Sequence, residues 1–300
     1  MTTTHPKTPW LRGSHVALVT PFKDGQVDEA SYRELIKWHL AEGTDGLVPC
    51  GTTGEAATLT TDEWKQVVSA AVDEVRLAGK AGEVPVVAGT GHNSTTVAIE
   101  RTAMAKEIGI DAALVVTPYY NKPTQEGLFR HYKAIVDQVQ MPVVVYNVPG
   151  RTGVNLLPET LARMVTDIPQ VQGTKDATAS LRQVSDIAEY CGDDFMLISG
   201  DDFTVLPLLS VGGCGVISVV ANIAPSWMAG LCKAFFEGDM AKAREFHFKL
   251  QPLSRGCFLE TNPSPAKTAL AMMGKIPMEF RLPMVPLQPE NESKLKKLLA

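Results

Sequence analysis

PVVVYNVPGRT (residues 142–152) and VQGTKDAT (residues 171–178) decide the fold, because each is an apolar run that ends abruptly in polar side chains. Val143, Val144 and Val145 form the continuous β-branched run expected of a strand that is buried on both faces. A stretch of helical character separates the two runs. A strand, a helix and a second strand form the unit from which parallel sheets are built. The sequence therefore predicts parallel β/α architecture here.

Short apolar runs of the same kind occur eight times, with amphipathic stretches between them. The runs begin at residues 15, 45, 84, 112, 142, 171, 195 and 214. In the stretch at residues 62–75, apolar residues repeat with the period of an α-helix, after Thr60 and Glu63 at the spacing of a capping box. Eight strands that alternate with helices predict an α/β fold, the (β/α)8 or TIM barrel. A doubly wound open sheet is the alternative, but the number and even spacing of the runs favour the barrel.

The chain continues well beyond the eighth run. Three further helices are expected at about residues 226–237, 240–251 and 263–273, followed by a helix-like tail after Pro289. A barrel needs only one closing helix after its last strand. We therefore expect a (β/α)8 catalytic barrel at residues 1–237 and a C-terminal helical extension at residues 238–300.

Composition argues against several classes of protein. The 300 residues are 45% hydrophobic and 20% charged, and the net charge of −5 argues against nucleic acid or an anionic membrane as a partner. Five scattered cysteines without a CxxC pair indicate reduced thiols. The N-terminus MTTTHPKTPW lacks the apolar segment of a signal peptide, and no apolar run approaches the roughly 20 residues that span a bilayer. These features predict a cytoplasmic protein.

In a barrel, the chemistry gathers at the carboxyl ends of the strands. The candidates from this rule are Thr52, Thr53, Glu55, Tyr119, Tyr120, Tyr146, Arg151, Lys175, Asp201 and Asp202. The turn GTTGE (residues 51–55) offers backbone N–H groups, beginning at Gly51, and two hydroxyls, which suit a carboxylate. Asp201 and Asp202 are interpreted more simply, as caps of the next helix.

Lys175 is the strongest candidate for a nucleophile. Burial disfavours the ammonium ion, so a lysine at the end of a buried strand has a lowered pKa. A neutral amine can attack a ketone and form a Schiff base. We therefore predict a Schiff-base enzyme in which Lys175 is the nucleophile and Tyr146 carries protons.

Other chemistries lack their sequence patterns. The six histidines show neither HxH nor HExxH spacing, so no metal is expected, and no GxSxG motif supports a serine hydrolase. GTGHNS (residues 89–94) has Ser94 where the dinucleotide fingerprint needs a third glycine, so it predicts a tight turn rather than a nicotinamide site. No cofactor is expected.

Six motifs occur in order along the chain: GTTGE, PYYNKP, YNVPGRTG, GTKDAT, GVISVVAN and NPSPAK (residues 262–267). Together they resemble the dihydrodipicolinate synthase family, within the pyruvate-dependent class I aldolases that include N-acetylneuraminate lyase. The resemblance covers about residues 13–286. It implies a TIM-barrel lyase, a homotetramer or dimer, that condenses pyruvate with L-aspartate 4-semialdehyde to 4-hydroxy-tetrahydrodipicolinate. This reaction is the first committed step of lysine and diaminopimelate biosynthesis.

The resemblance also implies which residues act in catalysis. Lys175 would form the imine with pyruvate. Tyr146, Thr52 and a Tyr120 lent by a neighbouring subunit would relay protons. A tyrosine, with an ordinary pKa of about 10, can do so only where hydrogen-bonded neighbours stabilise its transient phenolate.

A second group of residues would bind the substrates. Thr53, in the turn that begins at Gly51, would hold the pyruvate carboxylate together with Thr52, and the backbone of Ile217 would line the pocket. Arg151 would bind the carboxylate of aspartate semialdehyde, for which a guanidinium is the natural partner. The sugar-acid lyases of the family generally lack this arginine.

Two other functions are compatible with the sequence. One is another pyruvate-dependent class I aldolase or dehydratase that acts on a keto acid or a sugar acid. The other is a non-catalytic, ligand-binding homologue. The presence of the lysine, the tyrosine and the threonines of the expected catalytic set argues against it.

Regulation by lysine is the point at which this chain departs from the resemblance. Lysine-sensitive members resemble one another in an interface site with serine, histidine and glutamate ligands. The matching positions here are Ala56, Thr61, Trp64 and Val97. Because Val97 replaces the expected carboxylate, no obvious group would pair with the ammonium of lysine. We expect weak or absent feedback inhibition.

Overall fold

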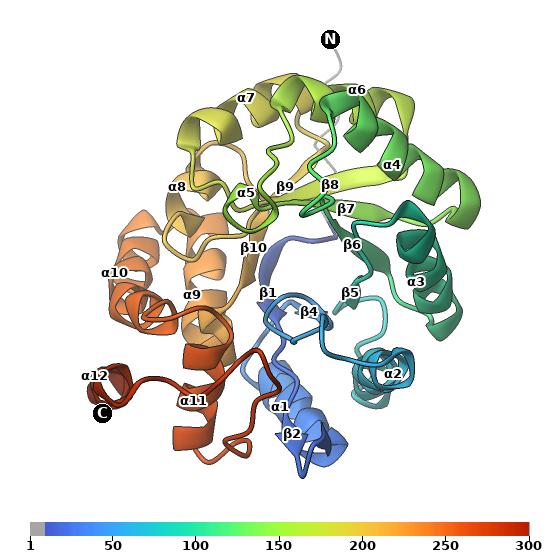
Figure 1. The fold of residues 1–300 in the computed structure, drawn as a ribbon. Helices are drawn as coiled ribbons and strands as arrows, with labels where there is room; N and C mark the ends of the chain where they lie inside the picture. The colour runs from blue at the N-terminus through green and yellow to red at the C-terminus, as the bar shows by residue number, and fades with distance from the viewer. Residues whose placement is uncertain (1–9, 300) are drawn as a thin grey trace.

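A closed barrel of parallel strands occupies the centre of the computed structural model, which describes residues 10–299, and helices surround it (Figure 1). The strands are β1 (Gly13–Ala17), β4 (Gly46–Val48), β5 (Val87–Gly89), β6 (Ala112–Val116), β7 (Val143–Asn147), β8 (Val171–Asp176), β9 (Met196–Ser199) and β10 (Gly215–Ser218). They pair in the order β4-β1-β10-β9-β8-β7-β6-β5. A parallel bridge between Leu47 and Val86 joins the two ends of this order. The predicted TIM barrel is confirmed, and the open sheet is excluded.

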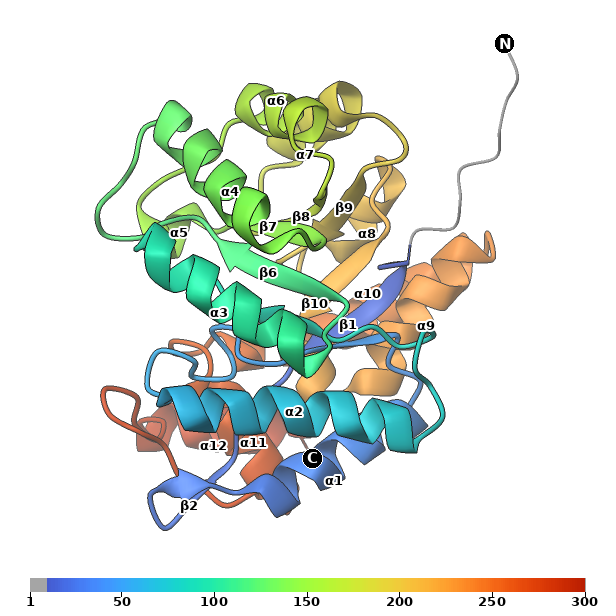
Figure 2. The same cartoon turned by 90° about the vertical axis from the view of Figure 1, so that its right-hand side faces the viewer.

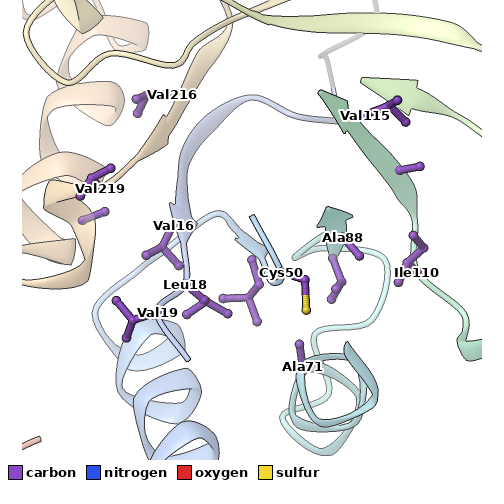
Figure 3. Packing of buried hydrophobic residues seen from close by; sticks show 14 of the residues in the cluster. Val16, Leu18, Val19, Cys50, Ala71, Ala88, Ile110, Val115, Val216 and Val219 are labelled. Carbon is purple, nitrogen blue, oxygen red and sulfur yellow. The ribbon is translucent and has the colours of Figure 1, made fainter. Parts of the chain in front are cut away.

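The helices of the barrel pack an apolar face on the outside of the strands. They are α1 (Glu29–Ala41), α2 (Thr61–Leu77), α3 (Thr95–Ile108), α4 (Gln125–Val139), α6 (Pro158–Asp167), α7 (Leu181–Cys191), α8 (Val205–Ser210) and α9 (Pro225–Phe236). The predicted capping box is present at the start of α2, where Thr60 and Glu63 each bond the other's backbone N–H. Ala71 of α2 belongs to the same buried cluster as Ala88 of β5 and Cys50 in the turn after β4 (Figure 3).

Several short elements were not expected from the sequence. They are the hairpin strands β2 (Phe22–Lys23) and β3 (Gln26–Val27), the helix α5 (Pro149–Thr152) and the 3-10 helix η1 (Val220–Asn222). None is long enough to show a hydrophobic period, which is the signal that predicts longer elements. Helix α5 matters for function because it carries Arg151.

The C-terminal part of the chain forms α10 (Met240–Cys257), α11 (Ser264–Met272) and α12 (Pro289–Leu299). Helix α10 packs on α9, and α12 packs on α10 and α11. In Figure 2, α11 and α12 lie behind α2, below the barrel. Helix α10 runs past residue 251, where we expected it to end, and continues through Pro252, because Leu250, Leu253 and Cys257 keep its face buried. Residues 237 and 238 lie in the turn between α9 and α10, and the division into two units there stays a prediction.

Two further observations concern the described residues. No helix among them is both long enough and apolar enough to cross a membrane. All five cysteines are free thiols, and four of them are buried. The first nine residues, to which the prediction about a signal peptide mainly refers, and residue 300 lie outside the part that the structure describes.

Candidate active site

A cavity of about 150 Å³ lies where the carboxyl ends of the strands converge. Eight residues are assigned a catalytic or substrate-binding role by the resemblance, and six of them line this cavity: Gly51, Thr52, Thr53, Tyr146, Arg151 and Lys175. A larger cavity of about 270 Å³ adjoins it and shares Thr52, Tyr146 and Arg151 among its lining residues. The hollow of about 940 Å³ at the amino ends of the strands contains none of the predicted residues. The candidate site therefore lies at the mouth of the barrel.

The other two residues with an assigned role, Ile217 and Tyr120, do not line this cavity. Ile217 is 1% exposed and belongs to the apolar cluster inside the barrel. Tyr120 is 89% exposed, with a positive φ of 73°. Its loop is tied down by Asn93 and Asn121, whose side-chain amides donate to Tyr119 O and Asn93 O respectively. The roles assigned to Ile217 and Tyr120 stay predictions.

The amine of Lys175 lies in a site that favours its neutral form. Lys175 is 6% exposed, and its Nζ is 4.2 Å from the centre of the Tyr146 ring, on the neighbouring strand. Burial lowers the pKa of Lys175 from 10.5 to about 8; the Asp202 carboxylate opposes this shift, and the positive charge of Arg151 adds to it. About a tenth of the amine is therefore uncharged at pH 7 and able to attack a carbonyl, far more than for a lysine of ordinary pKa.

Gly200 leaves the room that Lys175 occupies. A Cβ atom at this position would lie 3.0 Å from Lys175 Cγ and 2.9 Å from Ala177 Cβ. Both separations are shorter than normal contacts between carbon atoms. A larger residue at position 200 would force Ala177 or the Lys175 side chain to shift.

Tyr146 is a buried phenol at the end of β7. Burial raises its pKa, whereas the charge of Arg151 and a hydrogen bond with the Thr52 side chain lower it. The hydroxyl therefore keeps its proton at neutral pH, and these two neighbours stabilise a transient phenolate. This combination is suited to passing a proton to and from a bound substrate.

The turn that holds Thr52 and Thr53 offers several donors to one ligand. The N–H of Gly54 donates to Gly51 O at 3.2 Å and that of Glu55 to Thr52 O at 3.1 Å, which folds the turn tightly. Within residues 10–299, neither the Thr52 nor the Thr53 N–H has a hydrogen-bond partner. Two such N–H groups beside two hydroxyls can accommodate a carboxylate.

The prediction that Asp201 and Asp202 cap the next helix is wrong. Asp202 Oδ2 accepts from the N–H groups of Val219 and Val220, at 3.1 and 3.0 Å, and Asp201 Oδ2 accepts from the hydroxyl of Thr204. Neither carboxylate accepts from a backbone N–H of α8. Asp202 instead satisfies donors that follow β10. Burial raises its pKa to about 6, and its negative charge faces Lys175.

Comparison with known proteins decides the family. The sequence model of the dihydrodipicolinate synthetase family matches residues 10–300. The chain belongs to this family.

Curated relatives and solved structures agree with this assignment. A 4-hydroxy-tetrahydrodipicolinate synthase of Nitratidesulfovibrio vulgaris is 60% identical over 97% of this chain and 98% of its own length. One of Thermodesulfovibrio yellowstonii is 54% identical, over 96% and 97%. The crystal structure of dihydrodipicolinate synthase from Thermotoga maritima superposes with a TM-score of 0.93 at 45% identity and covers 96% of this chain and 97% of that one. The Aquifex aeolicus structure has a TM-score of 0.92 at 44% identity, with 96% and 97% covered.

In this member of the family, the structure adds site residues that sequence reasoning did not single out. Gly200, Val219, Phe258 and Asn262 also line the cavity. Asn262 opens the motif NPSPAK, so the motif itself was visible in the sequence. Its contact with Thr53, 209 residues earlier, was not visible, because sequence spacing gives no information on contacts between distant segments.

Proposed function

We propose that this chain is a 4-hydroxy-tetrahydrodipicolinate synthase, which condenses pyruvate with L-aspartate 4-semialdehyde in lysine and diaminopimelate biosynthesis. The observation that carries the proposal is the placement of a buried Lys175 amine beside Tyr146, in one cavity with the donors of the threonine turn and with Arg151. The shared name of the full-length relatives supports the same reaction.

Each chemical step has a group to perform it. The Lys175 amine attacks the ketone carbon of pyruvate, and loss of one water molecule gives the imine. Removal of a methyl proton then gives the enamine, whose carbon attacks the aldehyde carbon of the semialdehyde, and the aldehyde oxygen takes up a proton. We assign these proton transfers to Tyr146 and Thr52, whose side chains share a hydrogen bond. Finally the substrate amine attacks the imine carbon, closes the ring and releases Lys175 as the free amine.

Arg151 gives the site its preference for the second substrate. It lines both the inner cavity and the adjoining one, so it stands where the second substrate would enter. Its guanidinium can hold the carboxylate of aspartate semialdehyde with two hydrogen bonds. Pyruvate would bind deeper, with its carboxylate on the turn of Thr52 and Thr53.

The proposal includes a homo-oligomer, a tetramer or a dimer, in the cytoplasm. Tyr120 would complete the proton relay of a neighbouring subunit, since in its own chain it projects into solvent. Sedimentation of the purified protein tests the assembly. Mixing an inactive Tyr120→Phe variant with an inactive Lys175→Ala variant tests the lending of the residue, because mixed dimers would regain one intact site.

The deciding experiment measures turnover of pyruvate plus aspartate semialdehyde through a coupled reductase, with Lys175→Ala as the control. Turnover that disappears in the variant supports both the reaction and the nucleophile. A protein that forms a borohydride-trapped pyruvate adduct on Lys175 but shows no turnover is a different pyruvate-dependent aldolase or dehydratase. A protein that forms no adduct at all is a non-catalytic homologue.

A further inference from the structure

Asn262, in the segment between α10 and α11, lies inside the candidate site without an assigned role. It is 4% exposed and lines both the inner and the adjoining cavity. We propose that Asn262 is a positioning residue that aims the Thr53 hydroxyl at the pyruvate carboxylate and restrains the guanidinium of Arg151. This inference rests on the proposed function, because it concerns how the same site holds its substrates.

The side chain of Asn262 fixes the direction of the Thr53 hydroxyl proton. Asn262 Nδ2 donates to Thr53 Oγ1 at 2.9 Å, and both residues are buried. Since Oγ1 accepts this bond, its own proton must point elsewhere, and no acceptor for it is present within residues 10–299. That proton is available to an anion in the cavity that Thr53 lines.

The second polar atom of the amide has no protein partner. With Nδ2 toward Thr53, Asn262 Oδ1 is buried without a partner among the described residues. Turning the amide over would instead make Thr53 the donor to Oδ1 and leave both amide N–H groups without this acceptor. An aspartate at position 262 has only acceptor oxygens, so Asn262→Asp tests which orientation the protein uses.

The backbone of the same residue restrains Arg151. Asn262 O accepts from Arg151 Nη2 at 3.4 Å. A guanidinium has five N–H donors, so the remaining ones stay free for a substrate carboxylate. One residue thus contacts both groups that are proposed to bind carboxylates, Thr53 for pyruvate and Arg151 for the second substrate.

Asn262 is itself held by a rigid neighbourhood. Five residues further on, Lys267 Nζ lies 2.5 Å from Glu55 Oε1, and both side chains are 1% exposed. Ser264 Oγ, on the same segment, donates to Val285 O at 2.8 Å. Thr53 and Glu55 belong to one turn, so residues 262–267 contact this turn at two points, through Asn262 and through Lys267. Because Asn262 is held in place by these contacts, it can fix the orientation of the Thr53 hydroxyl.

A double-mutant cycle tests the inference through formation of the Schiff base alone. The assay traps the adduct of Lys175 with borohydride at increasing pyruvate concentration and needs no second substrate. Asn262→Ala is expected to raise the half-saturating pyruvate concentration about 3- to 10-fold, the effect of one neutral hydrogen bond, while adduct formation at saturating pyruvate stays near the wild-type level. In a Thr53→Val background the same substitution is expected to add nothing, because the hydroxyl that it orients is gone.

Two further variants complete the cycle. Asn262→Asp has the same size, but its side chain accepts a hydrogen bond rather than donating one, so it draws the Thr53 proton away from the ligand. It should raise the half-saturating pyruvate concentration at least as much as Asn262→Ala. If the alanine variant misfolds, this variant still tests the inference. Asn291→Ala is the control. It removes a hydrogen bond from a side-chain amide to Glu260, elsewhere in the C-terminal part of the chain, and should leave pyruvate binding unchanged.

Independent outcomes separate the two proposals. A wild-type half-saturating concentration in both Asn262 variants, or effects of Asn262→Ala and Thr53→Val that simply add, would overturn the positioning role. A wild-type protein that forms no pyruvate adduct would overturn the proposed function itself.

Discussion

Replacing Lys175 with methionine should make the protein more stable while abolishing the Schiff base. Methionine is unbranched and of similar length, so it can fill the space of the lysine side chain without a charge. A pKa of about 8 in place of 10.5 means that folding with a charged Lys175 costs about 3 kcal/mol at neutral pH. The variant also loses the contact between the ammonium and the Tyr146 ring, worth about 0.5–2 kcal/mol. We expect a net gain of about 1–3 kcal/mol and a melting temperature higher by a few degrees.

The pH dependence distinguishes this explanation from better packing alone. Between pH 8 and pH 10.5 the unfolded chain binds a proton at Lys175 and the folded protein does not, so wild-type stability rises with pH through this window. The advantage of the variant should therefore be complete below pH 8 and should shrink steadily toward pH 10. Thermal unfolding of both proteins at pH 7, 8.5 and 10 measures this. A variant that is less stable at pH 7, or an advantage that does not change with pH, would refute the reasoning.

Three other predictions follow from the site and its support. Arg151→Ala should still form the pyruvate adduct but lose about 10- to 100-fold in kcat/KM for aspartate semialdehyde, the effect of one charge-assisted bond; unchanged kinetics would contradict the role of Arg151. Millimolar lysine should leave turnover nearly unchanged, because Val97 offers no charge to its ammonium, and a halved rate would show that a lysine site exists. Lys267→Met should lower the free energy of unfolding by about 3–5 kcal/mol, since it leaves the buried Glu55 carboxylate without its cationic partner. Urea unfolding checks this, and a Lys267→Met, Glu55→Gln double variant should recover much of the loss.

The sequence was sufficient for the barrel because a strand buried on both faces has a simple signature. Most strands are short runs of apolar residues, although β1 and β8 include polar ones. The strand around Val144 has no charged residue because it is buried along its whole length. The helices were equally legible where a cap and an apolar stripe coincide, as in α2. The short elements that were missed are α5, β2, β3 and η1, which show no hydrophobic period.

The site was predictable to the extent that barrel geometry alone assembles it. Tyr146 and Lys175 come together because they end neighbouring strands in register. By contrast, Asp202 was misread as a cap, because nothing local says that its partners are the N–H groups of Val219 and Val220. Asn262 was overlooked for the same reason. Contacts between segments far apart in the chain depend on the folded structure, and no residue spacing in the sequence indicates them.

The ion pair between Glu55 and Lys267 has a consequence for the order in which the working protein is made. The two residues are 212 positions apart, so a ribosome that adds about 5–20 residues per second passes from one to the other in about 10–40 s. During this interval the turn with Thr52 and Thr53 has been synthesised, but residues 262–267, which contact it in the folded protein, have not. The barrel strands are all complete by Ser218, well before Lys267 exists. The nascent chain can therefore acquire its architecture before it acquires a finished pyruvate site, and catalytic competence arrives only with the last part of the protein to be synthesised.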